Sequence, residues 1–312
     1  MSLLSQDHLQ NEEAAYKWVE AHLWPEGPVC PHCGSVERIS KMAGKATRLG
    51  LYKCYACRKQ FRVTVGTIFE KSHVPMHIWL QAFYLLSGSK KGISSNQLHR
   101  TLGLTLKTAW FVSHRIREAM RVGSLAVPMG GGGGAVEIDE TYIGAETGVR
   151  KARGGYHHKR AVITLVSRGG EARSFHVEAA NTANVLPIVK ENLSTEAVAI
   201  TDESRIYDKL EGHAAHHVTV NHARGEYVSP GRDAWVQGDI HTNTVEGYFS
   251  VFKRGMRGTY QHCGEKHLHR YLAEFDFRYN NRKALGVEDE ARAAKMVIGA
   301  KGKRLTYRTT GG

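Results

Sequence analysis

Apolar and polar positions follow the clearest helical pattern in residues 241–258. Four apolar residues recur there at offsets of 0, 4, 7 and 11: Val245, Phe249, Phe252 and Met256. This spacing predicts a helix with one buried stripe. Glu246 and Lys253 lie two helical turns apart, so they share a different face of the same helix. An acid and a base so placed form either a surface ion pair or part of a site.

The residues before this helix predict a mixed sheet. AVEIDETYIG alternates around Asp139, and RAVITLVSRGG and ARSFHVEAA are two further β-rich runs separated by a Gly169–Gly170 hairpin signal. Asn181 is expected to cap a helix, and EAVAITDESRIY then forms a buried strand that ends near Asp202. HHVTVNHA is one more short strand. The order of these elements is typical of an α/β domain.

Two acids at strand ends and one acid on a helix can converge in such a layout. Asp139, Asp202 and Glu246 taken singly are ordinary caps or solvent-facing acids, so their order and context carry the prediction. Hard divalent cations prefer oxygen ligands, and clustered carboxylates repel one another unless cations neutralise them. We therefore expect a site that binds divalent metal ions, with Lys253 as a nucleic-acid contact beside it.

The N-terminal part contains two CxxC pairs with 20 residues between the inner cysteines, namely Cys30, Cys33, Cys54 and Cys57. Each pair can deliver two ligands from one tight turn, so this spacing predicts a tetrahedral Zn²⁺ site. Four thiolates leave no open coordination position, and the zinc would therefore be structural. Cys263 stands alone and is expected to be an ordinary thiol.

A helical segment follows the cysteine pairs. Ser94 and Gln97 form a capping-box signal for one helix that ends at Gly103, and Thr105 is expected to cap the next helix. Two helices around such a turn have the spacing of a helix-turn-helix, although helical hairpins without a ligand are common. The candidate major-groove or phosphate contacts on the second helix are Lys107, Thr108, Phe111, His114 and Arg115.

The chain carries 43 Lys and Arg against 30 Asp and Glu, which gives a net charge of +13. Such an excess favours a polyanionic partner, chiefly nucleic acid, over an ordinary basic enzyme. No apolar run approaches the ~18 residues needed to span a membrane, and no secretory segment is evident. Cysteines arranged for metal indicate a reducing compartment, so we expect a cytoplasmic, nucleoid-associated protein.

Long strings of residues carry a resemblance to a known family. They are WPEGPVCPHCG, YKCYACRKQF, VEIDETYIG, ITDESRIY, HTNTVEGYFSVFKRGMRGTYQH and YLAEFDFRYNNR. Through them the chain resembles bacterial insertion-sequence transposases of the zinc-ribbon DDE type, which are related to the Merlin-type elements of eukaryotes. The resemblance spans essentially the whole chain and implies an RNase H-like catalytic domain.

The resemblance also implies site residues and a reaction. Asp139, Asp202 and Glu246 would hold two Mg²⁺ or Mn²⁺ ions, and Lys253 would lie beside the DNA end. Water would nick the ends of the element, and the freed 3′-hydroxyls would attack target-strand phosphates. Some members carry Asn as the third ligand, and Asn243 lies one turn before Glu246, so Asn243 is an alternative neighbour of the site.

Double-stranded DNA, both terminal inverted repeats and target, is the implied partner, and we expect a homo-oligomer on DNA. Basic residues around the catalytic helix and in a preceding loop would contact backbone phosphates. These candidates are Arg150, Lys151, Arg153, His157, His158, Lys159, Arg160, Arg254, Arg257 and Arg278. Charge runs of this kind are also common on solvated surfaces that bind nothing.

The expected fold class is multidomain α/β with five segments. Residues 1–66 form a zinc ribbon with an N-terminal helix, and residues 67–128 form a helical, helix-turn-helix-like DNA-binding segment. Residues 129–135, which contain five consecutive glycines, are expected to be a flexible linker. Residues 136–290 form the RNase H-like mixed-sheet catalytic domain, and residues 291–312 a basic C-terminal tail.

Two other functions remain open from the residues. A non-enzymatic zinc-ribbon DNA-binding regulator would explain the first half of the chain and leave the three acids without a task. A tyrosine-type nuclease would use His267 and His269 with Tyr260 or Tyr271 as nucleophile. That His pair needs a strand, whereas its surroundings have a helical pattern, in which residues two apart diverge by about 200°.

Overall fold

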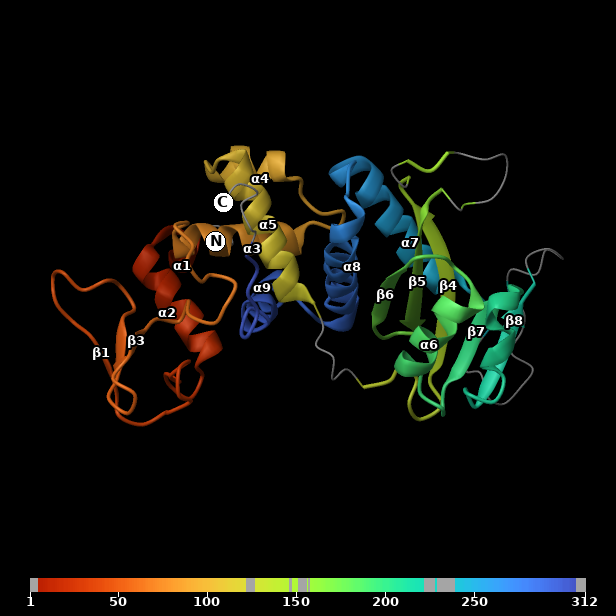
Figure 1. Cartoon of the computed structure of the whole chain (residues 1–312), viewed down its shortest axis with the longest axis horizontal. Coiled ribbons are helices and arrows are strands. Elements are labelled where there is room, and N and C mark those ends of the chain that lie inside the picture. The colour runs from red at the N-terminus through yellow and green to blue at the C-terminus, as the bar shows by residue number, and fades with distance from the viewer. Residues whose placement is uncertain are drawn as a thin grey trace. The chain divides into compact units, whose positions relative to one another are not determined.

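The computed structural model describes residues 5–121, 127–145, 148–150, 156, 158–221, 228 and 239–306. The chain divides into two compact units, and each is described by itself. One unit combines Met1–Arg121 with Val287–Gly312, and the other is Val122–Gly286 (Figure 1).

The first unit begins with two helices and a small antiparallel sheet. These elements are α1 (Asp7–Gln10), α2 (Glu12–Leu23), β1 (Ile39–Lys41), β2 (Tyr52–Cys54) and β3 (Gln60–Phe61). The strands pair in the order β1-β2-β3. A small core of Cys30, Tyr52, Cys54 and Phe61 lies under the sheet, with Trp24 packed against it. So few apolar side chains give little hydrophobic stabilisation, which is why a ribbon of this size depends on metal ligation.

Four helices complete this unit. They are α3 (Met76–Gly88), α4 (Ser95–Leu102), α5 (Leu106–Met120) and α9 (Asp289–Ile298). The predicted caps are confirmed, because Ser94 Oγ accepts from the Gln97 N–H and Thr105 Oγ1 accepts from the Thr108 N–H. Gly103 ends α4 in the left-handed conformation at φ 65°. The helix–turn–helix arrangement of α4 and α5 therefore follows from local capping.

The described part of the expected C-terminal tail, residues 291–306, differs from the prediction because it begins within a packed helix. Helix α9 contacts α2, α3 and α5, and it buries Ala293, Met296 and Val297. A Cβ atom on Gly299 would collide with the carbonyl oxygen of Ala119 at the end of α5, so the backbones approach closely there. The apolar stripe of α9 is short, so the sequence did not predict a packed helix. In the structure this stripe faces the helical core.

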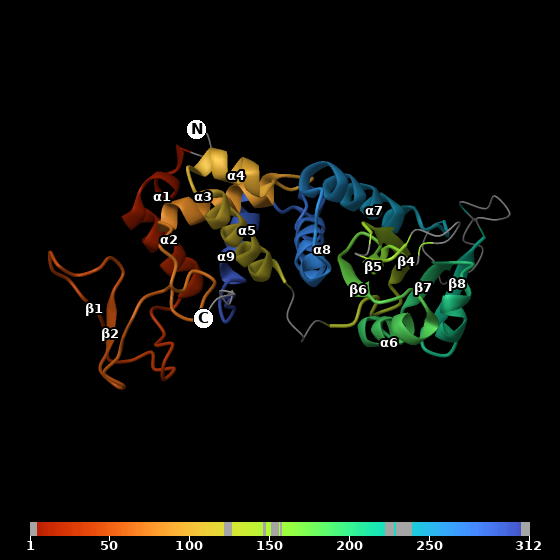
Figure 2. The same cartoon turned by 45° about the horizontal axis from the view of Figure 1, so that its top comes forward.

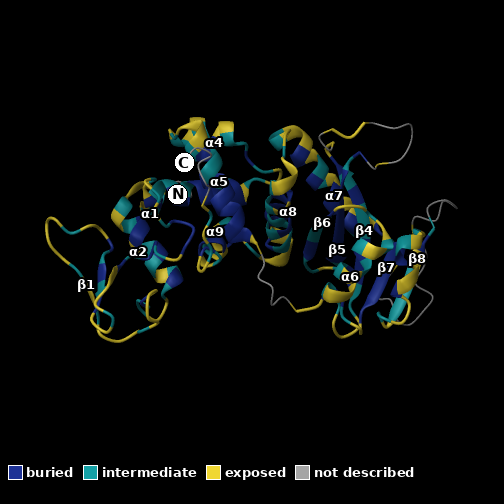
Figure 3. Cartoon of the chain, viewed as in Figure 1, coloured by how far each residue is buried: buried dark blue, intermediate teal, exposed yellow. Residues whose placement is uncertain are grey.

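The second unit is built on a five-stranded mixed sheet in the order β6-β5-β4-β7-β8. The strands are β4 (Ala135–Ile143), β5 (Arg160–Ser167), β6 (Ala172–Val177), β7 (Val198–Asp202) and β8 (His216–Val220). Strands β4, β5 and β6 pair antiparallel, whereas β7 runs parallel to both β4 and β8. The central strands are buried along most of their length (Figure 3). A mixed sheet was expected in this part of the chain, and the prediction is confirmed.

Helices cover both faces of this sheet (Figures 1 and 2). The helical elements are α6 (Thr182–Asn192), η2 (Arg205–Leu210), α7 (Asn243–Gly255), a π-helical turn η4 (Met256–Tyr260), α8 (Glu265–Asn280) and η5 (Lys283–Leu285). The predicted cap of α6 is confirmed, since Asn181 Oδ1 accepts from the Asn184 N–H. Helix α6 and η2 pack on one face, and α7 and α8 pack on the other. The predicted stripe of α7 faces the second of these cores.

The glycine run differs from the expected flexible linker. Met129 pairs with Leu193, and the Gly134 N–H bonds to the Gly130 carbonyl at 3.0 Å. Gly130 has φ +80°, and a Cβ there would lie 2.5 Å from the Cβ of Ala197. The glycines therefore form a turn packed into the second unit, and the two units divide at Arg121 and Val122 instead.

Candidate active site and zinc cluster

The register of two parallel strands brings the first two acids together. Glu137 on β4 pairs with Ile200 on β7, and Asp139 and Asp202 lie two residues further along each strand. Parallel strands lie about 4.8 Å apart and in-register side chains point to the same face. Asp139, in the middle of β4, and Asp202, the last residue of β7, therefore project side by side.

Helix α7 adds the third acid to the same cavity. A cavity of about 390 Å³ is lined by Asp139, Glu140, Asp202, Thr242, Glu246, Phe249, Ser250 and Lys253. Glu246 lies in the first turn of α7 and accepts a hydrogen bond from Thr242 Oγ1 at 3.1 Å. The other predicted site residue, Lys253, comes from the last turn of α7. Residues far apart in the sequence thus line one cavity.

Backbone groups orient the two aspartates. The Glu140 N–H donates to Asp139 Oδ1 at 2.7 Å, and the Ser204 N–H donates to Asp202 Oδ1 at 3.1 Å. These two bonds fix one oxygen of each carboxylate. That arrangement suits a carboxylate which must both hold a fixed orientation and bind a cation.

The cavity concentrates negative charge. Burial, followed by the neighbouring charges of Glu140, Asp202 and Glu246, raises the pKa of Asp139 to about 8. Burial also raises the pKa of Glu140 and lowers that of Lys253. Like charges that line one cavity are stabilised by a bound cation, and carboxylate oxygens are the donors that hard divalent metal ions prefer.

Sequence reasoning missed several residues of this cavity, and Glu140 is the most important. Its carboxylate accepts a hydrogen bond from the phenol of buried Tyr207 at 2.7 Å. Successive residues of a strand point to opposite faces, so a neighbour of Asp139 was not expected near the same cavity. The signal that could have revealed Glu140 is its place directly after Asp139 in a run of two adjacent acids on β4.

A second cavity of about 360 Å³ adjoins the first and is more basic. It shares Asp139, Glu140, Asp202 and Lys253 with the first cavity, and its remaining lining residues are Thr141, Tyr142, Tyr156, Lys159 and Arg257. Tyr142 and Tyr156 stack with ring centroids 4.7 Å apart, and Lys159 Nζ lies 4.8 Å from the Tyr156 ring. Positive charge beside the acids is suited to a polyanion approaching the metal site.

The basic residues predicted to contact DNA divide into exposed and buried groups. Lys107, Arg150, Arg254 and Arg257 are exposed, whereas Thr108 and Lys159 are partly buried. Lys151, Arg153 and His157 lie outside the described residues. Only the exposed and partly buried members of the set can reach a phosphate without a change in fold.

Arg115 and Arg160 differ from the prediction because their guanidinium groups are used inside the protein. Arg115 is 3% exposed and donates to the carbonyl oxygens of Ile68, Glu70 and Leu305. Arg160 is 9% exposed and donates to the Cys263 carbonyl at 2.7 Å. Three further members of the wider set are buried as well, namely His114, His158 and Arg278. Arg278 pairs with buried Glu274.

Two residues of the alternative interpretations lie away from the cavity. Asn243 is exposed and does not belong to the residues that line the acid cavity. His267 and His269 lie in α8, so they do not form the strand pair that a tyrosine-type nuclease requires. The Tyr260 phenol donates to Glu274.

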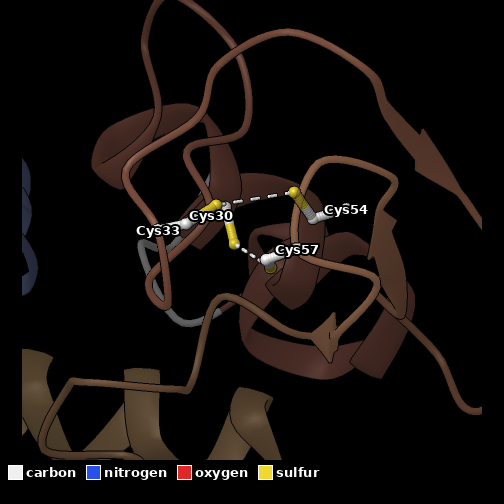
Figure 4. Close-up of side chains that lie close together, drawn as sticks. All are labelled: Cys30, Cys33, Cys54 and Cys57. Carbon is white, nitrogen blue, oxygen red and sulfur yellow. Dashed lines mark hydrogen bonds between the residues drawn. The ribbon is translucent and has the colours of Figure 1, made fainter.

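The four predicted cysteines form a separate cluster in the first unit (Figure 4). Their sulfur atoms all lie within 4.8 Å of one another, and the Cys30–Cys57 and Cys33–Cys54 Sγ distances are both 3.7 Å. A tetrahedron with Zn–S bonds of ~2.3 Å has sulfur–sulfur edges of about 3.8 Å. The cluster therefore has the dimensions of a structural Zn²⁺ site.

Two similar turns present the cysteines. The Gly34 N–H donates to the Cys30 carbonyl, and Gly34 and Arg58 follow the two CxxC pairs with φ of 74° and 62°. The backbone N–H groups of Cys57 and Ala56 lower the pKa of Cys54 to about 7. A thiol that ionises near neutral pH is ready to bind metal.

Comparisons with known proteins agree with this arrangement. The chain matches the ISXO2-like transposase domain over residues 132–280 and the transposase zinc-ribbon domain over residues 10–60. An uncharacterized protein in transposable element ISH50 of Halobacterium salinarum is 28% identical over 270 residues, which cover 82% of this chain and 86% of that protein. An uncharacterized transposase-like protein of Haemophilus influenzae is 24% identical over 100 residues, or 32% of this chain and 73% of that protein.

Among solved structures, the Mos1 strand transfer complex is similar at 14% identity and a TM-score of 0.28, over 73% of this chain and 78% of that one. Within the described residues, no helix is both long and apolar enough to cross a membrane.

Proposed function

We propose that the chain is an insertion-sequence transposase, because residues 132–280 match the ISXO2-like transposase domain and residues 10–60 match the transposase zinc-ribbon domain, and that it cuts and joins DNA strands at the Asp139, Asp202 and Glu246 cavity. The observation that carries the proposal is the meeting of these three acids in one cavity with Lys253. Their three elements, β4, β7 and α7, approach the cavity from different parts of the chain.

Two divalent ions, Mg²⁺ or Mn²⁺, held by these carboxylates would stabilise the attacking and leaving oxygens of an in-line phosphoryl displacement. The chain's own residues would hold and orient the substrate. Lys253 lines both cavities and is suited to a phosphate beside the scissile bond. Lys159 and Arg257 line the adjoining cavity and would bind flanking phosphates, mostly without reading sequence.

The first unit would bind the ends of the element. Lys107 is exposed and Thr108 is partly exposed in the first turn of α5, the second helix of the helix–turn–helix arrangement. The zinc cluster holds the ribbon together so that its exposed basic residues form a stable surface. Double-stranded DNA with terminal inverted repeats is the proposed ligand, and assembly of several copies on that DNA is part of the proposal.

Alanine substitutions at the three acids test the catalytic part. Asp139→Ala, Asp202→Ala and Glu246→Ala should each reduce strand cleavage of an end-containing oligonucleotide by about 10²-fold or more, since each removes a charge that acts on the reacting phosphate. Asn243→Ala is the matched control on the same helix and should keep cleavage near wild type. Binding of the DNA ends, measured by fluorescence anisotropy, should be unchanged in all four variants.

A cysteine substitution tests whether one of the same acids binds the metal. Asp202→Cys should be inactive with Mg²⁺ and recover part of its cleavage with Mn²⁺, because a thiolate is a soft ligand that Mg²⁺ binds poorly. Cleavage that survives all three alanine substitutions would contradict the catalytic role. End binding without any cleavage in the wild-type protein would favour a DNA-binding regulator instead.

A further inference from the structure

Glu137 is a fully buried carboxylate on β4, two residues before Asp139 and on the same face of the sheet. Its oxygen Oε2 accepts from the backbone N–H groups of Thr244 and Val245 at 2.8 and 3.0 Å. Its oxygen Oε1 accepts from the Thr244 hydroxyl at 2.7 Å. Both oxygens are therefore committed to the first turn of α7.

Helix α7 depends on this carboxylate for its N-terminal cap. Thr242, the residue at the N-cap position, makes no side-chain capping bond, and its hydroxyl donates to Glu246 instead. The first N–H groups of a helix have no partner within the helix, and their dipoles favour negative charge. Glu137 supplies both the missing acceptor and the charge from another element.

Arg168 balances the buried charge of Glu137. Its Nε donates to Glu137 Oε1 at 3.0 Å, and its other nitrogens donate to the carbonyls of Asp239 and His241, just before α7. A buried carboxylate is costly unless it is paired and hydrogen-bonded, and here every contact named is a donor. The pair thus joins β4 to the segment that leads into α7.

The consequence concerns the spacing of the proposed metal ligands. Asp139 follows Glu137 by two residues on β4, and Glu246 follows Val245 directly on α7. A single carboxylate therefore ties the strand that carries one acid to the helix turn that carries another. We infer that Glu137 is a positioning residue, which holds Glu246 at the distance from Asp139 that a shared pair of divalent ions needs. This inference rests on the proposed function of the cavity.

Glu137→Gln in the full-length protein is the direct test. A glutamine has one acceptor oxygen, so its amide NH₂ would face a donor at one of the two positions. We expect faster hydrogen exchange at the Thr244 and Val245 amides and Mn²⁺ binding weakened about 10–100-fold, as for other groups that support metal ligands. The kcat for cleavage should fall by a similar factor, while KM for DNA stays within about twofold.

Glu12→Gln is the matched control because Glu12 makes the same kind of cap in the other unit. Its carboxylate accepts from the N–H groups of Met76 and His77 at 2.8 and 3.1 Å, at the start of α3. Glu12→Gln should leave α7 exchange and Mn²⁺ affinity at wild-type values. If α7 exchange and Mn²⁺ affinity changed equally in Glu137→Gln and Glu12→Gln, the cause would be a general loss of stability. That result would overturn the inference.

Substitutions at Thr244 are milder, because they leave the charged Glu137 carboxylate beside Arg168. Thr244→Val removes only the hydroxyl donor to Glu137, whereas Thr244→Ser retains it. Mn²⁺ binding should weaken several-fold in Thr244→Val and return to near wild type in Thr244→Ser. Equal Mn²⁺ affinity and equal kcat in wild type, Glu137→Gln and Thr244→Val would refute the positioning role.

The outcomes also separate this inference from the proposed function. If the wild-type protein binds Mn²⁺ in the acid cavity but does not cleave DNA, the proposed function fails, and loss of Mn²⁺ affinity in Glu137→Gln still supports positioning. If the wild type cleaves DNA and Glu137→Gln matches it, the positioning role fails while the proposed function stands.

Discussion

Glu137, Asp139 and Glu140 lie within one strand, and each has a different set of partners. Glu137 binds the start of α7, Asp139 lines the acid cavity beside Asp202, and Glu140 accepts from Tyr207. The pleat of the strand separates Glu140 from the other two. Hydrogen-bond donors on the neighbouring elements therefore distinguish these three acids, and Asp139 is the one proposed to bind cations.

Helix α5 offers a comparison between a proposed DNA contact and a structural cation. Lys107→Ala should weaken DNA-end binding and reduce the slope of log affinity against log salt by about one, with little change in Tm. Arg115→Ala should lower the free energy of unfolding of the first unit by roughly 3 kcal/mol, because it leaves buried carbonyl oxygens without their donor. Anisotropy titrations at several salt concentrations and thermal melts measure the two effects. A normal Tm for Arg115→Ala together with a reduced salt slope would reverse the assignment.

The cysteines and the buried arginines show what the sequence could and could not predict at the residue scale. The cysteine ligands were predictable because the spacing of two CxxC pairs is local and the chemistry of the thiolates is specific. The burial of Arg115 was not predictable, because its partners Ile68 and Leu305 lie far away in the sequence. Arg160 was misplaced for the same reason.

At the scale of the elements, helix caps divide into local and distant ones. Ser94, Thr105 and Asn181 cap their own helices and were predicted from neighbouring residues. Helices α3 and α7 have no side-chain cap from their own N-cap residues, and the carboxylates of Glu12 and Glu137 bind their first turns instead. The helices were predictable from periodicity, whereas these distant caps emerge only once the elements are packed.

Helix α8 is attached to the sheet through Asp276. Its carboxylate accepts from the Ser174 N–H and hydroxyl and from the Tyr248 phenol, at 2.8, 2.7 and 2.6 Å. Burial outweighs these hydrogen bonds and raises the pKa of Asp276 to about 6. The folded protein therefore binds a proton more tightly than the unfolded chain, and this residue stabilises the fold less as the pH rises from about 4 to about 6.

Asp276→Asn tests this effect, because asparagine does not take up that proton. The free energy of unfolding of the wild type, relative to that of the variant, should fall by roughly 2 kcal/mol between pH 4 and pH 7. Hydrogen exchange at the β5 and β6 amides reports the unfolding of this unit at each pH. A difference between the two proteins that does not change with pH would show that Asp276 stays ionised throughout the range.

At the scale of the whole molecule, the two ends of the chain build one unit and the catalytic unit is inserted between them. The sequence predicted the order of ribbon, helical segment and mixed sheet, because each has its own periodicity or ligand pattern. It did not predict that α9 returns to the first unit. Ten residues with a modest apolar stripe look the same whether they pack or remain exposed.

Removal of Val287–Gly312 should therefore damage the first unit rather than the catalytic unit to which it is adjacent in sequence. The loss of Met296, Val297 and Ala293 from the core costs on the order of 5 kcal/mol, which is comparable with the whole stability of many domains. We expect a lower Tm, faster exchange in α3 and α5, and loss of DNA-end binding. Exchange in β4 and β5 should stay slow.

Two point substitutions on α9 make the same test without shortening the chain. Met296 is fully buried, and Met296→Ala should destabilise the first unit by about 2–5 kcal/mol. Ile298 is 53% exposed, so Ile298→Ala should change the free energy of unfolding by about 0.5 kcal/mol or less. If both substitutions were neutral and the shortened chain bound DNA ends normally, α9 would not belong to the first unit's core. If Met296→Ala instead increased exchange in β4, the helix would stabilise the catalytic unit, and the division of the chain would have to be redrawn.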